Sequence, residues 1–124
     1  MTPQDLPGAG PAILLADDDE GSRTLLVRAL QRSGFEVLEA SCGLEALALF
    51  DANAGRIRLL ITDVMMPDLR GPDVAARLRR LMPALPVLYV TGYAERQGID
   101  RDDQLMQKPF TTSSFIATVN GILR

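Results

Sequence analysis

The chain has 124 residues, of which 47% are hydrophobic, and a single globular domain of this size buries roughly two thirds of its unfolded surface. Its formal net charge of -3, from 13 basic and 16 acidic residues, gives no broad electrostatic reason for direct binding to nucleic acid. The absence of histidine and the single cysteine, Cys42, exclude an internal disulfide, a multi-thiolate metal site and a phosphohistidine within this chain.

No apolar run approaches the roughly 20 residues that a membrane-spanning helix needs. The N-terminus also lacks the basic and then apolar pattern of a signal peptide, so we expect a cytoplasmic protein that does not insert into a membrane. Residues 1–11 hold three prolines and two glycines without an apolar period, which predicts a flexible N-terminal tail or linker. The folded domain is expected over residues 12–124.

From Ala12 onward, apolar runs alternate with segments of helical periodicity. Ala12 to Ala16 is continuously apolar, as in a strand covered on both faces, and the helical pattern after it ends at Gly34. Phe35 to Ala40 alternates imperfectly between apolar and acidic residues, which predicts an edge or half-covered strand. The other expected strands are 58–62, 87–90 and 105–107, and the other expected helices lie around 44–50, 74–82 and 115–123.

This alternation of five strands with about five helices predicts an α/β domain. Its sheet should be parallel, with right-handed crossovers and helices on both faces. Gly71 and Pro72 mark the start of the third helix, and Thr111 or Thr112 caps the last one. In such a sheet the loops after the first and third strands can lie side by side where the strand order reverses, and ligands bind there.

Polar motifs follow four of the predicted strands. An acidic run begins at Asp17, Asp63 ends an apolar stretch before a loop with a proline, and Thr91 and Lys108 follow the last two strands. Each motif alone has an ordinary structural explanation: helix capping for the acidic run, a turn for Asp63 and Thr91, and loop entry for Lys108. Their occurrence together, in order and at the same end of four strands, favours one functional site.

The acidic residues of this site predict a bound cation. Clustered carboxylates repel one another, and Mg²⁺ prefers such hard oxygen ligands. Asp18 and Asp63 fit direct ligation, Asp17 can hold a metal-bound water, and the backbone carbonyl of Met65 can complete the protein's share.

The same residues predict transfer of a phosphoryl group. A free carboxylate oxygen of Asp63 can attack phosphorus and form an aspartyl phosphate. The negative charge of the loose transition state lies on the equatorial oxygens of the phosphoryl group. The protein's main task is therefore to position this group and to neutralise its charge. Lys108 can supply a positive charge opposite the metal, and Thr91 can donate a hydroxyl to a phosphoryl oxygen. Met65 and Tyr93 flank the predicted pocket as bulky side chains that hinder the attacking water and so prolong the phosphoryl state.

The chain resembles the receiver domains of two-component response regulators in four stretches: Ile13–Asp19, Ile61–Pro67, Val90–Gly92 and Lys108–Phe110. The resemblance extends from Ala12 to Arg124. It implies a flavodoxin-like (βα)5 fold with strand order 2-1-3-4-5 and a cis peptide bond between Lys108 and Pro109. It also implies that the phosphoryl group comes from a histidine kinase or a histidine phosphotransfer protein.

The resemblance further implies roles for single residues. Asp63 is the expected phosphoacceptor, Asp17 and Asp18 are the acidic pair, Thr91 is the switch hydroxyl and Lys108 is the phosphate-sensing lysine. Phosphorylation then biases a two-state protein-interaction surface by drawing Thr91 toward the phosphate. Such a domain is not a classical enzyme, although Mg²⁺-dependent self-phosphorylation from a phosphodonor and slow autodephosphorylation are expected. The oligomeric state is left open between a monomer and a phosphorylation-dependent dimer.

Two features depart from the common receiver pattern. Gly92, Gly98 and the charged run Asp100–Asp103 leave little room for the usual fourth helix, which we expect to be short, irregular or disordered. Leu105 stands three residues before the lysine, where many receivers carry an aromatic residue. Receivers attached to hybrid sensor kinases often have such sequences. The resemblance therefore leaves open whether this domain is a relay module or a stand-alone domain.

An alternative hypothesis is a protein-interaction module that has the receiver fold but is not phosphorylated. The complete set of Asp18, Asp63, Thr91 and Lys108 argues against it, because a purely structural domain has no physical reason to assemble that set. A phosphatase that uses an aspartyl phosphate would need a second aspartate two residues after the nucleophile. The chain has Met65 at that position.

Overall fold

The centre of the structure is a five-stranded sheet in a computed structural model that describes residues 10–92 and 98–124. All neighbouring strands are parallel and the strand order is β2-β1-β3-β4-β5, which confirms the predicted fold. The strands are β1 (Ala12–Ala16), β2 (Glu36–Ala40), β3 (Ile57–Asp63), β4 (Val87–Thr91) and β5 (Gln104–Gln107). The helices of the described residues are α1 (Glu20–Arg32), α2 (Gly43–Ala52), α3 (Gly71–Leu81) and α4 (Thr112–Leu123).

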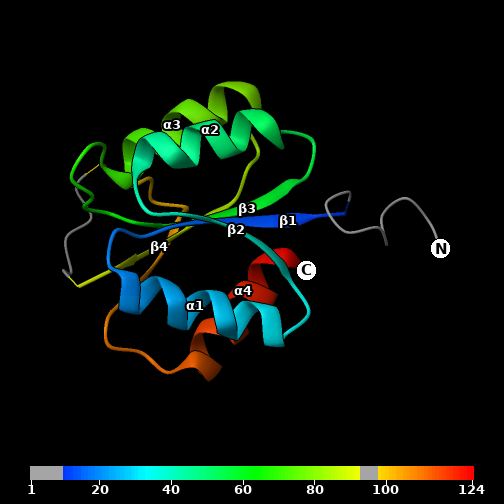
Figure 1. Cartoon of the computed structure of the whole chain (residues 1–124), viewed down its shortest axis with the longest axis vertical. Coiled ribbons are helices and arrows are strands. Elements are labelled where there is room, and N and C mark those ends of the chain that lie inside the picture. Colours follow the sequence, from blue (N-terminus) through cyan, green and yellow to red (C-terminus); the bar gives the residue numbers. More distant parts are fainter. Residues whose placement is uncertain (1–9, 93–97) are drawn as a thin grey trace.

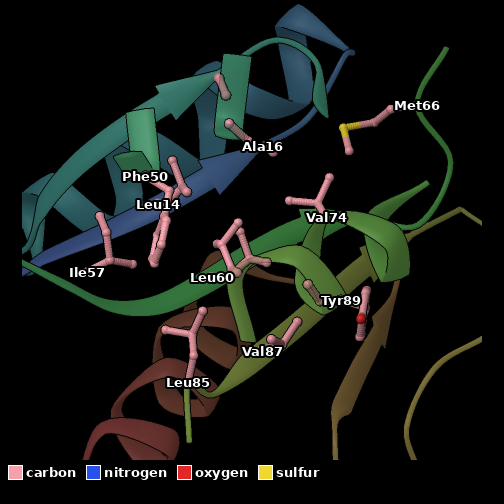
Figure 2. Packing of buried hydrophobic residues seen from close by; sticks show 14 of the residues in the cluster. Leu14, Ala16, Phe50, Ile57, Leu60, Met66, Val74, Leu85, Val87 and Tyr89 are labelled. Atoms are coloured by element: carbon pink, nitrogen blue, oxygen red, sulfur yellow. The ribbon is translucent and has the colours of Figure 1, made fainter. Parts of the chain in front are cut away.

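The helices cover both faces of the sheet. In Figure 1, α2 and α3 lie on one face, and α1 and α4 lie on the other. The first strand, β1, is buried along its whole length, as its uninterrupted apolar run predicted. Ala12, Leu14 and Ala16 belong to the core beneath α2 and α3, whereas Ile13 and Leu15 belong to the core beneath α1 and α4. Figure 2 shows part of the first core, in which Leu14 and Leu60 from adjacent strands lie among side chains of the overlying helices.

The two outer strands are less covered than the central ones. β2 pairs only with β1 and most of its residues are half-buried, which confirms the prediction of an edge strand for this segment. β5 forms the opposite edge, and none of its four residues is fully buried. Both edge strands are short, which limits how much unpaired backbone they expose.

Local capping explains where α1 begins and ends and where α4 begins. The Asp19 side chain accepts a hydrogen bond from the Ser22 N–H at the start of α1. Gly34 follows the end of α1 with a φ of 90°, a conformation that glycine adopts without a steric penalty. At α4 the capping residue is Thr111, whose Oγ1 accepts from the Ser114 N–H at 3.0 Å. This distinguishes it from Thr112, the other candidate.

The connection between β4 and β5 contains no helix in its described residues, which are Gly92 and 98–103. Asp103 and Arg79 of α3 join there in a bidentate ion pair, with N···O distances of 2.7 and 2.8 Å. The same guanidinium donates to the Leu85 carbonyl, and Ile99 packs against the core beneath α2 and α3. The described part of the connection is therefore held against α3, and the described residues contain four helices where about five were expected.

Residues 1–9 of the expected tail lie outside the described residues. Gly10 is buried, and its carbonyl oxygen accepts a hydrogen bond of 2.9 Å from Arg56 Nε. No helix among the described residues is long and apolar enough to cross a lipid bilayer.

Candidate functional site

The strand register brings the four predicted motifs to one edge of the sheet. Asp17 directly follows β1, and Asp63 and Thr91 are the last residues of β3 and β4. Asp63 pairs with Val90, and Thr91 pairs with Gln107, the residue that precedes Lys108. Parallel strands share one direction, so their carboxyl ends lie at a common edge, where open α/β sheets place their sites.

Three carboxylates gather at this edge. One oxygen from each of Asp17, Asp18 and Asp63 lies within 4.8 Å of the others. Asp17 is buried, Asp63 is half-buried, and Asp18 is exposed. The first two residues of the acidic run thus reach the site, whereas the third, Asp19, caps α1.

Lys108 places its ammonium group among these carboxylates. Its Nζ lies 3.0 Å from Asp17 Oδ2 and 3.5 Å from Asp63 Oδ2. Its backbone N–H donates to the Thr91 carbonyl at 2.7 Å, which ties the segment after β5 to the end of β4. The Lys108–Pro109 peptide bond is cis, as predicted.

Both carboxylate oxygens of Asp17 have hydrogen-bond partners. Oδ2 accepts from Lys108, and Oδ1 accepts from the Asp19 N–H at 2.9 Å. The Asp17 side chain has no exposed surface, so its orientation is set by these two bonds. Asp63 is less constrained, because its Oδ1 accepts one longer bond of 3.3 Å from the Met65 N–H.

The environment shifts the ionisation of two groups. Burial raises the pKa of the Asp63 carboxyl above its ordinary value, and the negative charges of Asp17 and Asp18 raise it further, whereas Lys108 and the Met65 N–H lower it. Burial lowers the pKa of Lys108. This effect is outweighed by the hydrogen bond to Asp17 and by the charges of Asp17 and Asp63, so the pKa of Lys108 lies above its ordinary value. Charged Lys108 therefore neutralises part of the carboxylate cluster.

The remaining predicted residues differ in how they reach the site. Thr91 is buried at the end of β4. Met65 is 50% exposed, and its backbone N–H donates a hydrogen bond to the Asp63 carboxylate. Tyr93 lies outside the described residues.

The donor set at this edge fits Mg²⁺. Its members in the described part of the chain are the carboxylate oxygens of Asp17, Asp18 and Asp63, and the sequence has no histidine that could add an imidazole ligand. Hard oxygen ligands of this kind, one or two of them carboxylates, are typical of Mg²⁺ sites that also bind phosphate.

Two contacts of the segment that follows Asp63 were not singled out from the sequence. A Cβ on Gly71 would lie 2.2 Å from the Asp63 carbonyl oxygen, so only glycine lets the start of α3 approach Asp63 this closely. The Asp68 carboxylate accepts hydrogen bonds from the Gly43 and Leu44 N–H groups at the start of α2. The Gly-Pro pair at residues 71–72 was a signal for the first contact. Nothing in the local sequence indicates the second, since it joins segments far apart in the chain.

Comparison with known proteins gives consistent matches. The family model of the response regulator receiver domain matches residues 13–120. The sensor kinase CckA of Brucella abortus (strain 2308) is 34% identical over 124 residues, which cover 96% of this chain and 13% of CckA. The response regulator receiver protein CpdR of the same organism is 30% identical over 116 residues, which cover 90% of this chain and 95% of CpdR. The transcriptional regulatory protein PhoP of Bacillus subtilis (strain 168) is 38% identical, and the match covers 90% of this chain and 48% of PhoP.

Solved structures of similar proteins share the fold. The receiver domain of the hybrid histidine kinase CckA superposes with a TM-score of 0.81 at 34% identity, covering 91% of this chain and 99% of that domain. The response regulator TrrA of Thermotoga maritima, crystallised in complex with Mg²⁺ and BeF, superposes with a TM-score of 0.80 at 29% identity, covering 91% of this chain and 99% of TrrA.

Proposed function

Because the chain belongs to the response regulator receiver domain family, we propose that it accepts a phosphoryl group on Asp63 from a phosphohistidine of a partner protein. Receiver domains are phosphoacceptor switch modules rather than classical enzymes, and they interact with histidine kinases or histidine phosphotransfer proteins. The observation that carries the proposal is the cluster of Asp17, Asp18 and Asp63, with Lys108 Nζ 3.5 Å from the Asp63 carboxylate.

In the proposed reaction, a carboxylate oxygen of Asp63 forms a bond to phosphorus while the bond between phosphorus and the donor imidazole nitrogen breaks. The Lys108 ammonium group faces the developing charge on the phosphoryl oxygens, and the Thr91 hydroxyl donates a hydrogen bond to one of them. Asp17 holds Lys108 in place through its 3.0 Å ion pair. The chain thus supplies the attacking oxygen and positions and neutralises the transferred group, and the imidazole nitrogen of the donor leaves with the electrons of the broken bond.

We assign the Mg²⁺ ligands to Asp18 and Asp63 directly, to Asp17 through a water molecule, and to the backbone carbonyl of Met65. Mg²⁺ bound there would supply positive charge to the phosphoryl oxygens. The closeness of the three carboxylate oxygens supports this assignment, and so does the Mg²⁺ and BeF complex of the similar protein TrrA.

The consequence of phosphorylation is a change of surface. The Thr91 side chain moves toward the phosphate and biases the domain between two states, which a downstream protein distinguishes. We place this activity in the cytoplasm, in residues 12–124 with residues 1–11 as a tail or linker. The protein is a monomer or a phosphorylation-dependent dimer that does not bind nucleic acid directly.

The test is labelling with acetyl phosphate. Wild-type protein with Mg²⁺ should gain one phosphoryl group in the intact mass spectrum, and removal of Mg²⁺ with a chelator should abolish the gain. Asp63→Asn should not be labelled, although it folds and keeps the shape of the side chain. Labelling that persists in Asp63→Asn would refute the assignment of Asp63, and the absence of labelling in wild-type protein would favour an unphosphorylated interaction module.

The exposed Met65 side chain gives a second test of the site. We propose that Met65, together with Tyr93, hinders the water that attacks the aspartyl phosphate. Met65→Asn replaces an apolar side chain by one that can orient water, so its phosphoryl group should be lost faster than that of the wild type. The loss is followed by intact mass after the phosphodonor is removed, with Met82→Leu, a change far from the site, as the control. An unchanged rate in Met65→Asn would remove Met65 from the proposal.

A further inference from the structure

The Asp68 carboxylate links the loop after β3 to the start of α2. Its Oδ1 accepts from the Gly43 N–H at 2.9 Å, and its Oδ2 accepts from the Leu44 N–H at 2.8 Å. The residue at the N-cap position of α2, Cys42, makes no side-chain capping bond. Asp68 therefore performs for α2 the function that an N-cap side chain usually performs from within the same segment.

A second contact shows that the two segments fit closely. A Cβ on Gly43 would lie 2.7 Å from the Leu69 Cβ and 3.2 Å from Val74 Cγ2. Gly43 thus allows the loop to lie directly on the first turn of α2. The Leu44 and Gly43 N–H groups also hold the pKa of Asp68 down at about 2.

The loop is also fixed at both of its ends near Asp63. At its start the Met65 N–H donates to Asp63 Oδ1, and at its end the Gly71 N–H donates to the Val64 carbonyl at 2.8 Å. Met65 is 50% exposed, so packing of its side chain constrains the loop only in part. Asp68 attaches the same loop to the start of α2.

We propose that Asp68 is a positioning residue for the metal site. By clamping the loop of residues 64–70 to the start of α2, it fixes the Met65 backbone carbonyl and so sets the affinity of the site for Mg²⁺. This inference rests on the proposed function, because it takes the Met65 carbonyl as a ligand. Groups that orient metal ligands from outside commonly change the metal affinity by about 10- to 100-fold when they are removed.

The test is a Mg²⁺ titration followed by the amide signals of ¹⁵N-labelled protein. In the wild type, the Gly43 and Leu44 amide signals should shift with the same midpoint as the Met65 signal, because Asp68 connects them. Asp68→Ala should weaken Mg²⁺ binding by about tenfold, and its Gly43 and Leu44 signals should no longer follow Mg²⁺. Asp68→Asn keeps one acceptor oxygen, so its affinity for Mg²⁺ should lie between the affinities of the wild type and Asp68→Ala.

Glu45→Ala is the matched control. The Glu45 carboxylate accepts from the Ser41 N–H at 2.9 Å, so this bond caps the same end of α2 but joins it to the segment before the helix and not to the loop of residues 64–70. This variant should bind Mg²⁺ as the wild type does. A Mg²⁺ affinity of Asp68→Ala equal to that of the wild type would overturn the proposal, and so would an equal loss in Glu45→Ala. If Asp68→Ala does not fold, Asp68→Asn decides by the same comparison. Failure of wild-type protein to bind Mg²⁺ would overturn the proposed metal site as well, whereas normal binding in every variant would overturn only the role of Asp68.

Discussion

The ammonium nitrogen of Lys108 lies 3.5 Å from a carboxylate oxygen of Asp63, and the two residues reach each other from the ends of different strands. The same nitrogen forms a shorter ion pair with buried Asp17. Lys108 is therefore the cation that makes the close approach of three carboxylates tolerable in the protein without metal. The first two predictions follow from this arrangement.

Removal of the Lys108 charge should destabilise the protein and increase its response to Mg²⁺. Lys108→Ala leaves the buried Asp17 carboxylate without its cation, and we expect a loss of about 2 to 3 kcal/mol in the free energy of unfolding. Chemical denaturation with and without Mg²⁺ measures both effects. Mg²⁺ should stabilise Lys108→Ala more than the wild type, because the variant has more uncompensated negative charge. Arg80→Ala, which removes an exposed charge from α3, should change neither quantity measurably; an equal Mg²⁺ response in Lys108→Ala and the wild type would contradict the prediction.

Lys108 is the only lysine in the sequence, so protein labelled with ¹⁵N-lysine gives one side-chain ammonium signal. Titration of that signal should show a pKa above the ordinary value of 10.5. In Asp63→Asn the pKa of Lys108 should fall, because one of the two charges that raise it is gone. The stability that Lys108 contributes should be complete below pH 10.5 and should be lost as the pH rises through its raised pKa. A pKa of Lys108 that does not change in Asp63→Asn would show that the two side chains are further apart in solution.

Asp63→Asn should stabilise the protein at neutral pH in the absence of Mg²⁺. Because the pKa of folded Asp63 is raised above its ordinary value of 3.8, the folded state binds the proton more tightly than the unfolded state. The contribution of Asp63 to stability is therefore present below pH 3.8 and is lost as the pH rises through the raised pKa. Urea unfolding between pH 3 and 8 measures the free energy of unfolding. As the pH rises across this window, the value for the wild type should fall below the value for Asp63→Asn. Parallel profiles of the two proteins would contradict the raised pKa.

Gly71→Ala should disturb Asp63 directly. The new Cβ would lie 2.2 Å from the Asp63 carbonyl oxygen, so the start of α3 must move, at a cost of about 1 to 3 kcal/mol. Labelling of Asp63 by acetyl phosphate should slow as well. Gly121→Ala in α4 is the matched control, because its Cβ meets nothing within 4 Å and alanine should stabilise the helix by about 0.5 to 1 kcal/mol. Equal unfolding free energies for the two variants would rule out the close approach of Gly71 to Asp63.

The ion pair of Arg79 and Asp103 should hold the connection between β4 and β5. Asp103 is almost completely buried, so we expect Arg79→Ala to cost about 2 kcal/mol and to speed hydrogen exchange of amides in residues 98–103. Arg79→Lys keeps the charge but loses the bidentate geometry and should recover only part of the loss. A double-mutant cycle with Asp103→Asn gives the coupling energy between the two side chains. A coupling energy near zero, together with unchanged exchange, would contradict the prediction.

The order of helices and strands could be predicted because it depends on local patterns. The uninterrupted apolar run of Ala12–Ala16 matches the bounds of β1, and the helical spacing that ends before Gly34 matches the end of α1. The third strand was predicted to end at Thr62, but β3 includes Asp63, because that residue pairs with Val90 of β4. A pairing between distant segments of this kind leaves no mark in the local pattern.

The site shows the same division. Asp17, Asp63, Thr91 and Lys108 could be found because each ends or directly follows a strand, and parallel strands end at one edge. The link between Asp68 and α2 could not, since it depends on how closely a loop and a helix pack in three dimensions. The strand order and the cis peptide bond at Lys108 were predicted from the family resemblance, because the residues alone leave several arrangements possible.

β1 contributes side chains to both cores, and this affects how its register with the neighbouring strands is determined. Both of its faces are apolar, so a slip by one residue would exchange mostly apolar side chains between the two cores, and hydrophobicity alone penalises it weakly over most of the strand. What differs between the faces is side-chain volume. A slip in one direction would place Ile13 where Ala12 lies beneath α2 and α3 and would carry Asp17 to the place of Ala16, and a slip in the other direction would place Leu15 where Ala16 lies. Steric fit at the two small residues, together with the charge of Asp17, therefore selects the alignment that sets Asp17 beside Asp63.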